Sequence, residues 1–365
     1  MSQSPNAFDL TRYGWDEEFE TMFATMFAGN RRAGLTPARI VRVDGERCDA
    51  VTEHGSIRAD VSAMLGSDPL HWPCTGDWAA VRPDASPRLV AVLPRRTAIV
   101  RSSASRTSHG QVLAANVDTV LITVALAAPL NPGRVERLIT LAWESGARPV
   151  IVLTKADLTD QIAAVRAEVE ALAPGAEVVA VSAVSGAGMD RLTALLTGTA
   201  VLLGPSGTGK STLGNALLGE HMLATGAVRA QDGKGRHTTV RRELVPLPGG
   251  GVLIDTPGLR GIGLFDAADG LGQTFAEIER LAEDCRFADC GHETEPGCAV
   301  RAAIEAGALT ERRLSSYRKL QRENEWAAAR SDARTRAELR AERADRSKAF
   351  AKQLRATYTF HNRTR

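Results

Sequence analysis

Long hydrophobic runs are missing from this chain of 365 residues. The longest apolar stretch, around residues 120–130, is too short to cross a bilayer and predicts a buried strand. A secretory leader is not indicated, because the opening residues carry acidic side chains: Asp9, Asp16, Glu17, Glu18 and Glu20. A composition of 44% hydrophobic and 24% charged residues is typical of a globular protein of two or three domains. We therefore expect a cytoplasmic protein without a membrane partner.

Cysteine is also scarce, with five in the whole chain. Cys48 and Cys74 stand alone, which predicts ordinary packed or surface thiols. The other three, Cys285, Cys290 and Cys298, lie within fourteen residues of one another. In a cytoplasmic protein this spacing favours a metal site over a disulfide.

Together with His292, these three cysteines form the pattern C-x4-C-x-H-x5-C. Three thiolates and one imidazole make a closed tetrahedral set that suits a structural zinc ion. The set leaves no open position, so we expect no catalysis there. The alternative is three packed cysteines beside an unrelated histidine. Zinc would add folding energy to a segment with a thin core.

The net charge of the chain is +2, but the charged residues are distributed unevenly along it. Residues 311–365 hold 16 Lys and Arg against 7 Asp and Glu, whereas the rest of the chain holds 29 against 36. A second basic stretch at 85–117 contains no acidic residue and five arginines, namely Arg88, Arg95, Arg96, Arg101 and Arg106. Such patches favour a polyanionic partner, although a solvated helix is the plain alternative for the tail.

The sequence divides into four parts by pattern. Residues 1–36 form an extension with a short amphipathic helix at WDEEFETMF, and 37–101 read as about five short strands, the last of them TAIVR. An OB-type barrel is the leading interpretation of these strands, with an SH3-like barrel as the alternative. Residues 110–265 alternate apolar strands with helices, which predicts a doubly wound parallel α/β sheet. Residues 266–365 are mainly helical and end in the basic tail.

A glycine-rich loop follows the apolar strand VLL and precedes a helix. The segment GPSGTGKS matches G-x-x-x-x-G-K-[ST], whose backbone N–H groups bind phosphates at a helix N-terminus. Lys210 can reach the β- and γ-phosphates, and Ser211 can ligate Mg²⁺. The predicted loop comprises Gly204, Pro205, Ser206, Gly207, Thr208, Gly209, Lys210, Ser211 and Thr212.

The segment DTPG at 255–258 follows another apolar strand. Asp255 can hold the Mg²⁺ shell, and the Gly258 N–H can meet the γ-phosphate; an Asp-initiated turn is the alternative. The polar segment between the two motifs resembles a switch loop, in which Thr238 or Thr239 would bind Mg²⁺ when the γ-phosphate is present. A plain exposed loop remains the alternative for that segment.

A guanine reader of the (N/T)KxD type is missing downstream of the phosphate loop, where it usually lies. It occurs upstream instead, as Thr154, Lys155, Ala156 and Asp157. The Asp157 carboxylate can accept both guanine N1–H and the exocyclic amine, which adenine does not offer together. At the end of the next strand, Ser182 and Ala183 begin SAVSG, where a backbone N–H can meet guanine O6.

All parts of a GTPase are therefore present in a rotated order: base readers, phosphate loop, switch and DTPG. Ligands bind at the carboxyl ends of the strands of a doubly wound sheet, whatever the order of the strands along the chain. Circular permutation thus preserves the site, and it makes DTPG lead directly into the C-terminal region.

These motifs in this order resemble the RsgA (YjeQ) family of bacterial small ribosomal subunit biogenesis GTPases. GDW at 76–78, GQVLAANVDTVLI at 110–122 and SSYRKLQRE at 315–323 add to the resemblance, which covers about 37–323. It implies an OB barrel, a circularly permuted GTPase domain and a zinc-binding C-terminal domain. It also implies GTP hydrolysis to GDP, stimulated by the small subunit and its rRNA, during late maturation. We expect a monomer.

One feature shared with this family concerns the water molecule that attacks GTP. Leu259 follows DTPG where Ras-like switches carry a water-orienting Gln, so slow turnover is expected for the protein alone. His237, in the switch loop, is the candidate to orient water, with a solvated or RNA-facing histidine as the alternative.

Three other functions are alternatives to this interpretation. A different phosphate-loop enzyme, such as an ATPase or small-molecule kinase, would bind ATP equally well. A non-catalytic RNA-binding scaffold would hold nucleotide without hydrolysing it. A permuted GTPase of the large subunit is disfavoured by the combination of barrel and zinc pattern.

Overall fold

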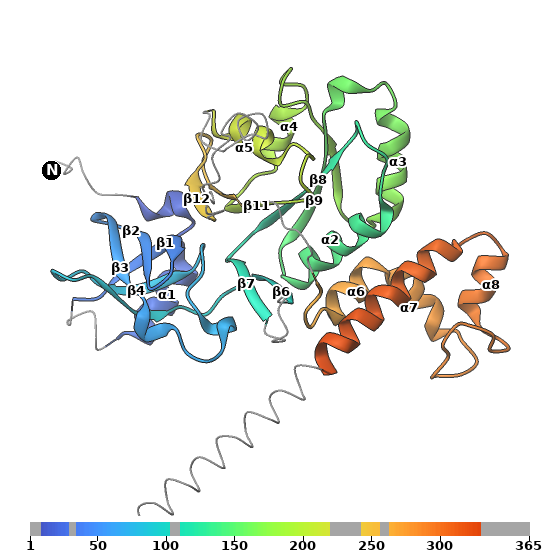
Figure 1. The fold of residues 1–365 in the computed structure, drawn as a ribbon, viewed down its shortest axis with the longest axis horizontal. Helices are drawn as coiled ribbons and strands as arrows, with labels where there is room; N and C mark the ends of the chain where they lie inside the picture. Colours follow the sequence, from blue (N-terminus) through green and yellow to red (C-terminus); the bar gives the residue numbers. More distant parts are fainter. Residues whose placement is uncertain (1–8, 29–33, 103–109, 220–241, 256–262, 330–365) are drawn as a thin grey trace, which may run out of the picture.

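The computed structural model describes residues 9–28, 34–102, 110–219, 242–255 and 263–329. Figure 1 shows three regions, with the barrel (blue) and the C-terminal helices (orange) on opposite sides of a central α/β sheet. None of the described helices combines the length and the apolar character that a membrane span needs.

The N-terminal region is a closed five-stranded barrel with the strand order β1-β2-β3-β5-β4. β5 lies between β3 and β4 and pairs with β3 in parallel. This Greek-key order confirms an OB-type barrel and excludes a simple meander. The strands are β1 (Thr36–Asp44), β2 (Arg47–Thr52), β3 (Gly55–Asp60), β4 (Trp78–Arg82) and β5 (Arg88–Val92). Short 3-10 turns, η3 (Ser62–Met64) and η4 (Pro69–His71), lie between β3 and β4.

The expected amphipathic helix is α1 (Glu17–Met26), preceded by the turn η1 (Leu10–Tyr13). Asp16 begins α1 by accepting the Glu18 and Phe19 N–H groups at 3.1 and 3.0 Å. Its apolar face buries Phe19 and Phe23 in one cluster with Trp78 of β4, so α1 closes one side of the barrel.

The strand expected at 97–101 does not belong to the barrel. As β6 (Ala98–Ser102) it pairs with β7 (Gly110–Ala115) in a separate two-stranded sheet. The prediction was wrong for this strand because alternation of apolar residues identifies a strand but not its partner. The four domain boundaries stay predictions.

The barrel meets the central region at a close contact between two backbone segments. Gly76 has φ +93°, and an added Cβ there would lie 2.3 Å from the Ala115 carbonyl oxygen. The Asn116 amide donates to the Gly76 carbonyl at 3.0 Å. Nearby, the buried Arg39 of β1 donates to Thr199 Oγ1 at 2.9 Å. The GDW and LAANVD motifs therefore form the junction between the two regions.

The central region is a six-stranded sheet in the order β10-β9-β8-β11-β13-β12. Its first five strands are parallel, and β12 pairs antiparallel with β13. The strands are β8 (Thr119–Ala125), β9 (Arg148–Thr154), β10 (Glu177–Ala180), β11 (Thr199–Leu203), β12 (Glu243–Pro246) and β13 (Val252–Asp255). The doubly wound parallel architecture predicted from sequence is confirmed.

Helices cover both faces of this sheet. In the part of the chain that the structure describes, each face carries two helices, and the two helices of a face pack in one apolar cluster with the strands. On the first face lie α2 (Pro132–Glu144) and α3 (Ile162–Leu172). On the second face lie α4 (Met189–Ala194) and α5 (Lys210–Leu218). The short turn η5 (Ala156–Leu158) follows β9.

The C-terminal region is helical, as predicted. It consists of α6 (Ala268–Thr274), α7 (Ala276–Glu283), α8 (Ala299–Glu305) and a helix over 311–329, called here the C-terminal helix. These helices share an apolar core that includes Phe275, Ile278 and Leu314, each fully buried. α6 lies along α2, so the C-terminal region packs on the side of the sheet that α2 covers (Figure 1).

Candidate functional site: a nucleotide site and a metal cluster

The candidate nucleotide site lies where the sheet reverses its strand order. β8 is central, and the chain builds outward from it first through β9 and β10, then through β11 and β13. The crevice outside the carboxyl ends of β8 and β11 is thus a topological switch point, the usual ligand position in such sheets. The predicted base readers follow β9 and β10, the phosphate loop follows β11, and Asp255 ends β13.

The phosphate loop adopts a conformation that depends on its glycines. Gly204, Gly207 and Gly209 all have positive φ angles, of 152°, 86° and 86°. Gly209 is the N-cap of α5, and no side chain caps this helix. The first N–H groups of α5 therefore face the crevice side of the loop without a side-chain acceptor, which suits a phosphate oxygen.

Lys210 is buried, at 8% exposure, and its ammonium group stays within the loop. Its Nζ donates to the carbonyls of Gly204 and Pro205 at 2.8 and 2.7 Å. This places the cation of the motif among the loop carbonyls, where it can transfer its hydrogen bonds to phosphate oxygens.

The upstream TKAD motif contacts the phosphate loop directly. The Thr154 hydroxyl donates to the Thr208 carbonyl at 2.6 Å, and Lys155 Nζ donates to the Gly207 carbonyl at 2.9 Å. Lys155 has the left-handed backbone conformation, with φ 60°. Segments that lie about fifty residues apart in sequence are therefore joined at one edge of the sheet.

The other residues predicted to contact the base lie at the same edge. Asp157 is exposed in η5, and the Ala156 N–H donates to the Val181 carbonyl at 3.1 Å, which ties the TKAD turn to the end of β10. Ser182 is buried, and its hydroxyl accepts the Ser185 N–H at 3.1 Å, which folds SAVSG into a compact turn. Ala183 begins that turn beside the TKAD segment.

Some of the residues predicted to bind Mg²⁺ and the γ-phosphate lie in the described part of the chain. Ser211 lies in the first turn of α5, and Thr212 follows it on the exposed side. Asp255 is half-buried at the end of β13, next to the phosphate-loop strand. The others, His237, Thr238, Thr239, Gly258 and Leu259, lie outside the described residues.

A cavity of about 230 Å³ adjoins the phosphate loop. The loop residues Ser206 and Gly207 form one wall, and Val135 and Leu138 of α2 contribute to the other. Lys155 also lines the cavity. Sequence reasoning missed the role of α2 here, because the segment after β8 carries no phosphate-binding motif.

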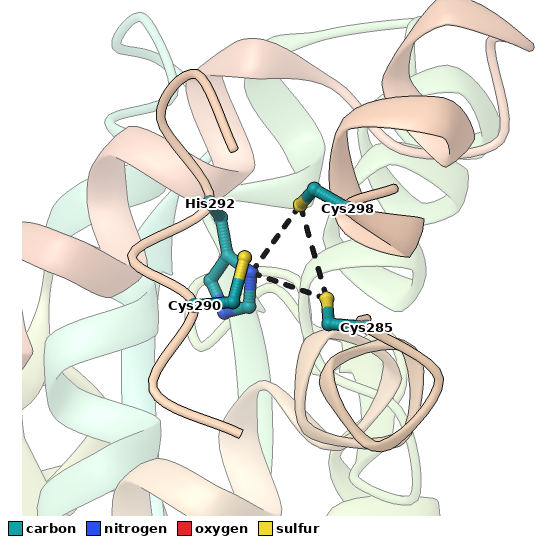
Figure 2. A group of neighbouring side chains, drawn as sticks. All are labelled: Cys285, Cys290, His292 and Cys298. Atoms are coloured by element: carbon teal, nitrogen blue, oxygen red, sulfur yellow. Dashed lines mark hydrogen bonds between the residues drawn. The ribbon is translucent and has the colours of Figure 1, made fainter. Parts of the chain in front are cut away.

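The four predicted metal ligands converge in the C-terminal region (Figure 2). Their ligand atoms all lie within 4.8 Å of one another. The Cys285 and Cys298 sulfurs are 3.8 Å apart, and His292 Nδ1 lies 3.6 and 3.5 Å from them. Two thiolates bound tetrahedrally at about 2.3 Å from zinc are separated by about 3.8 Å, so this geometry fits a zinc ion. Cys290 completes the set.

The surroundings of the cluster support metal binding. Burial, with the charge of Arg318 adding to it, lowers the pKa of His292, which favours the neutral imidazole that binds metal. The Arg301 N–H donates to Cys298 Sγ at 3.4 Å at the start of α8. Glu295 accepts the N–H groups of Gly291 and Thr294 and thereby orders the loop between ligands.

Two arginines of the basic 85–117 stretch pair with acidic residues of the same chain. Arg95 pairs with the fully buried Asp77 at 2.7 Å, and it also donates to two backbone carbonyls. Arg96 pairs with Asp16 at 2.5 Å. The stretch therefore offers fewer free cations to a polyanion than its composition indicates, although Arg88 is exposed.

Comparisons with known proteins agree with this arrangement. The RsgA GTPase family model matches residues 92–265. A relative from Streptomyces coelicolor is 57% identical over 346 residues, which cover 93% of this chain and 93% of the relative. A relative from Streptomyces avermitilis is 55% identical and covers 93% and 92%. Both are named small ribosomal subunit biogenesis GTPase RsgA.

Solved structures show the same architecture. YjeQ from Thermotoga maritima matches with a TM-score of 0.56 and 26% identity, covering 78% of this chain and 97% of that one. YloQ, described as a circularly permuted GTPase, matches in fold with a TM-score of 0.54 and 22% identity, covering 82% and 96%. The phosphate loop, the upstream TKAD segment that contacts it and this relationship together place the chain in the RsgA family: it is a circularly permuted GTPase that hydrolyses GTP.

Proposed function

We propose that this GTPase binds the small ribosomal subunit and acts in its late maturation in the cytoplasm, with hydrolysis stimulated by the subunit. The observation that carries the proposal is the 57% identity to an RsgA protein over 93% of both chains. A protein so similar, with the same permuted site, is expected to share the substrate and the partner. We further expect it to act as a monomer.

The guanine nucleotide is expected to lie across the crevice between β9 and β11. Asp157 selects guanine by accepting its two N–H groups, while Lys155 lies along the base and holds Gly207. The Ala183 N–H meets guanine O6. The loop from Gly204 to Thr212, together with Lys210, binds the phosphates.

Ser211, Asp255 and one of the switch threonines, Thr238 or Thr239, provide the oxygen ligands that suit Mg²⁺. When bound, Mg²⁺ would neutralise charge on the β- and γ-phosphates. The Gly258 N–H is proposed to meet the γ-phosphate. These residues follow from the motifs, and Ser211 and Asp255 lie at the same edge of the sheet.

In hydrolysis, a water oxygen attacks the γ-phosphorus and the bond to the β,γ-bridging oxygen breaks. GDP leaves, and the protons of water end on the inorganic phosphate and the solvent. Lys210 stabilises the charge that develops on the phosphates. His237 is proposed to orient the water when the subunit is bound; full stimulation of His237→Ala by the subunit would reject this role.

The barrel and the basic tail are proposed to hold rRNA. The barrel exposes Arg47 and Arg88, and the segment 311–365 carries an excess of basic residues. The cluster of Cys285, Cys290, His292 and Cys298 is proposed to bind one structural zinc ion that holds the C-terminal region in shape.

Whether GTP or GDP is bound is proposed to determine the orientation of the zinc-binding region. Two connections support this idea. The chain passes from Asp255 to the C-terminal region within a few residues. In addition, α2 lines the cavity beside the phosphate loop with Val135 and Leu138, and it binds the C-terminal helix through Glu136.

Co-sedimentation with isolated ribosomal subunits tests the proposed partner. The chain, saturated with a non-hydrolysable GTP analogue, is expected to sediment with small subunits and to dissociate as salt rises or when GDP replaces the analogue. Large subunits are the matched control. Equal binding to both subunits, or to neither, would reject the proposed partner while leaving the GTPase assignment intact.

A further inference from the structure

A pair of threonine hydroxyls lies directly beneath the phosphate loop. Thr123, near the end of β8, and Thr208, within the loop, place their Oγ1 atoms 2.7 Å apart. Both residues are buried, at 1% and 9% exposure. No motif covers Thr123, which looks from the sequence like one more position in an apolar strand.

The hydrogen atoms of this pair can be assigned from its neighbours. Thr208 Oγ1 donates to the Pro205 carbonyl at 2.9 Å, which uses its single hydrogen. Thr123 then donates to Thr208 Oγ1 at 2.7 Å, in preference to its longer contact of 3.2 Å with the Leu203 carbonyl. The result is a chain of hydrogen bonds that runs from β8 into the loop and closes the turn from Pro205 to Thr208.

Gly204 and Pro205, at the start of the phosphate loop, also lie close to these two hydroxyls. A Cβ added at Gly204 would lie 2.2 Å from Thr123 Oγ1, so the loop begins in close contact with this hydroxyl. The Pro205 carbonyl that accepts from Thr208 also accepts from Lys210 Nζ at 2.7 Å. Thr123 is therefore linked, through Thr208 and Pro205, to the lysine that binds phosphate.

We infer that Thr123 is a positioning residue for GTP. Its hydroxyl, 2.7 Å from Thr208 Oγ1, fixes the rotamer of Thr208 and thereby holds the phosphate loop in the conformation that receives the phosphates. This support comes from β8, and it is separate from the support that Thr154 of β9 gives to the Thr208 carbonyl. The inference rests on the GTPase assignment and adds a residue to its machinery.

Thr123→Val tests this role, because it removes the hydroxyl and keeps the shape. A lost hydrogen bond of ordinary strength predicts GDP affinity about 2- to 10-fold weaker, measured with fluorescent mant-GDP and Mg²⁺. The KM for GTP should rise by a similar factor while kcat changes little, since ground-state phosphate binding is affected. Thr123→Ser should restore both values. Thr36→Val, which removes a buried hydroxyl of the barrel, is the matched control and should leave both unchanged.

A double-mutant cycle with Thr208→Val separates this role from a general loss of stability. Thr123→Val removes the donor to Thr208 Oγ1 and Thr208→Val removes the acceptor for Thr123 Oγ1, so each single variant leaves one end of this hydrogen bond unmatched, whereas the double variant leaves neither end. The double variant should therefore bind mant-GDP more tightly than the product of the single effects predicts. Strictly multiplicative effects, or wild-type affinity in Thr123→Val, would overturn the inference. Should Thr123→Val not fold, Thr123→Ala compared with Thr123→Ser gives the same test, because the pair again differs in the hydroxyl that contacts Thr208. Failure of the wild-type chain to bind mant-GDP would instead reject the GTPase assignment.

Discussion

Arg313 of the C-terminal helix and Glu136 of α2 form an ion pair of 2.8 Å in which both side chains are almost completely buried. Arg313 uses the rest of its guanidinium on Glu277 and on the carbonyls of Leu172 and Thr274. Glu136 also accepts hydrogen bonds from Arg312 and Ser316. The pair thus connects the C-terminal region to a helix that lines the cavity beside the phosphate loop.

Replacing Arg313 by Met should destabilise the protein strongly. The change removes a buried cation from Glu136, Glu277 and the Leu172 and Thr274 carbonyls at once, a loss that costs about 3–5 kcal/mol even though Arg312 still pairs with Glu136. Urea unfolding should report the drop in the free energy of unfolding. Arg322→Met, on the exposed side of the same helix, is the control and should cost less than about 0.5 kcal/mol. Equal stability of the two variants would show that the pair does not fasten the two regions.

Gly76→Ala should loosen the junction between barrel and sheet. The new Cβ would approach the Ala115 carbonyl oxygen to 2.3 Å, and the φ angle of +93° is unfavourable as well. Gly45→Ala isolates the second effect, because Gly45 has φ +62° with nothing within 4 Å. We expect the melting temperature to fall clearly further in Gly76→Ala than in Gly45→Ala. Similar falls in melting temperature for the two variants would mean that the new Cβ at position 76 is accommodated beside the Ala115 carbonyl without loss of stability.

Removal of the metal should unfold the C-terminal region selectively. Purified protein is expected to hold one zinc ion per chain by elemental analysis, and a strong chelator should lower its melting temperature. Cys298→Ala should lose the metal, whereas Cys48→Ala, outside the cluster, should retain it. A full zinc content in Cys298→Ala would contradict the ligand set.

Asp157→Ala should abolish the preference for guanine. The wild-type chain is expected to bind GTP far more tightly than ATP, because only guanine satisfies the Asp157 carboxylate. In the variant, affinity for GTP should fall towards that for ATP while the phosphate contacts remain. Asp160→Ala, an exposed neighbour, should keep the preference. Competition between the two nucleotides for mant-GDP-loaded protein provides the measurement, and an unchanged preference in Asp157→Ala would reject its role.

The sequence was sufficient for the features that short segments specify. The glycine loop, the TKAD turn and the Cys-His spacing each depend on a few neighbouring residues with demanding chemistry, so their placement could be predicted. The doubly wound sheet followed from alternating strands and helices for the same reason.

The missed features depend on partners that lie far apart in the chain. Glu136 and Arg313 are ordinary charged residues of two helices, and nothing in the local pattern pairs them across 177 positions. Thr123 sits in an apolar strand that any β-branched residue suits. The strand β6 has the alternation of a barrel strand, and only the packed structure shows that its partner is β7.

The rate of GTP hydrolysis with and without purified small ribosomal subunits tests the central claim most directly. The account predicts slow turnover by the chain alone, a large increase on adding small subunits, and no increase with Lys210→Ala, which lacks the cation at the phosphates. Large subunits serve as the control and should leave the rate low. A wild-type rate that small subunits do not raise, or a rise that persists in Lys210→Ala, would contradict the account.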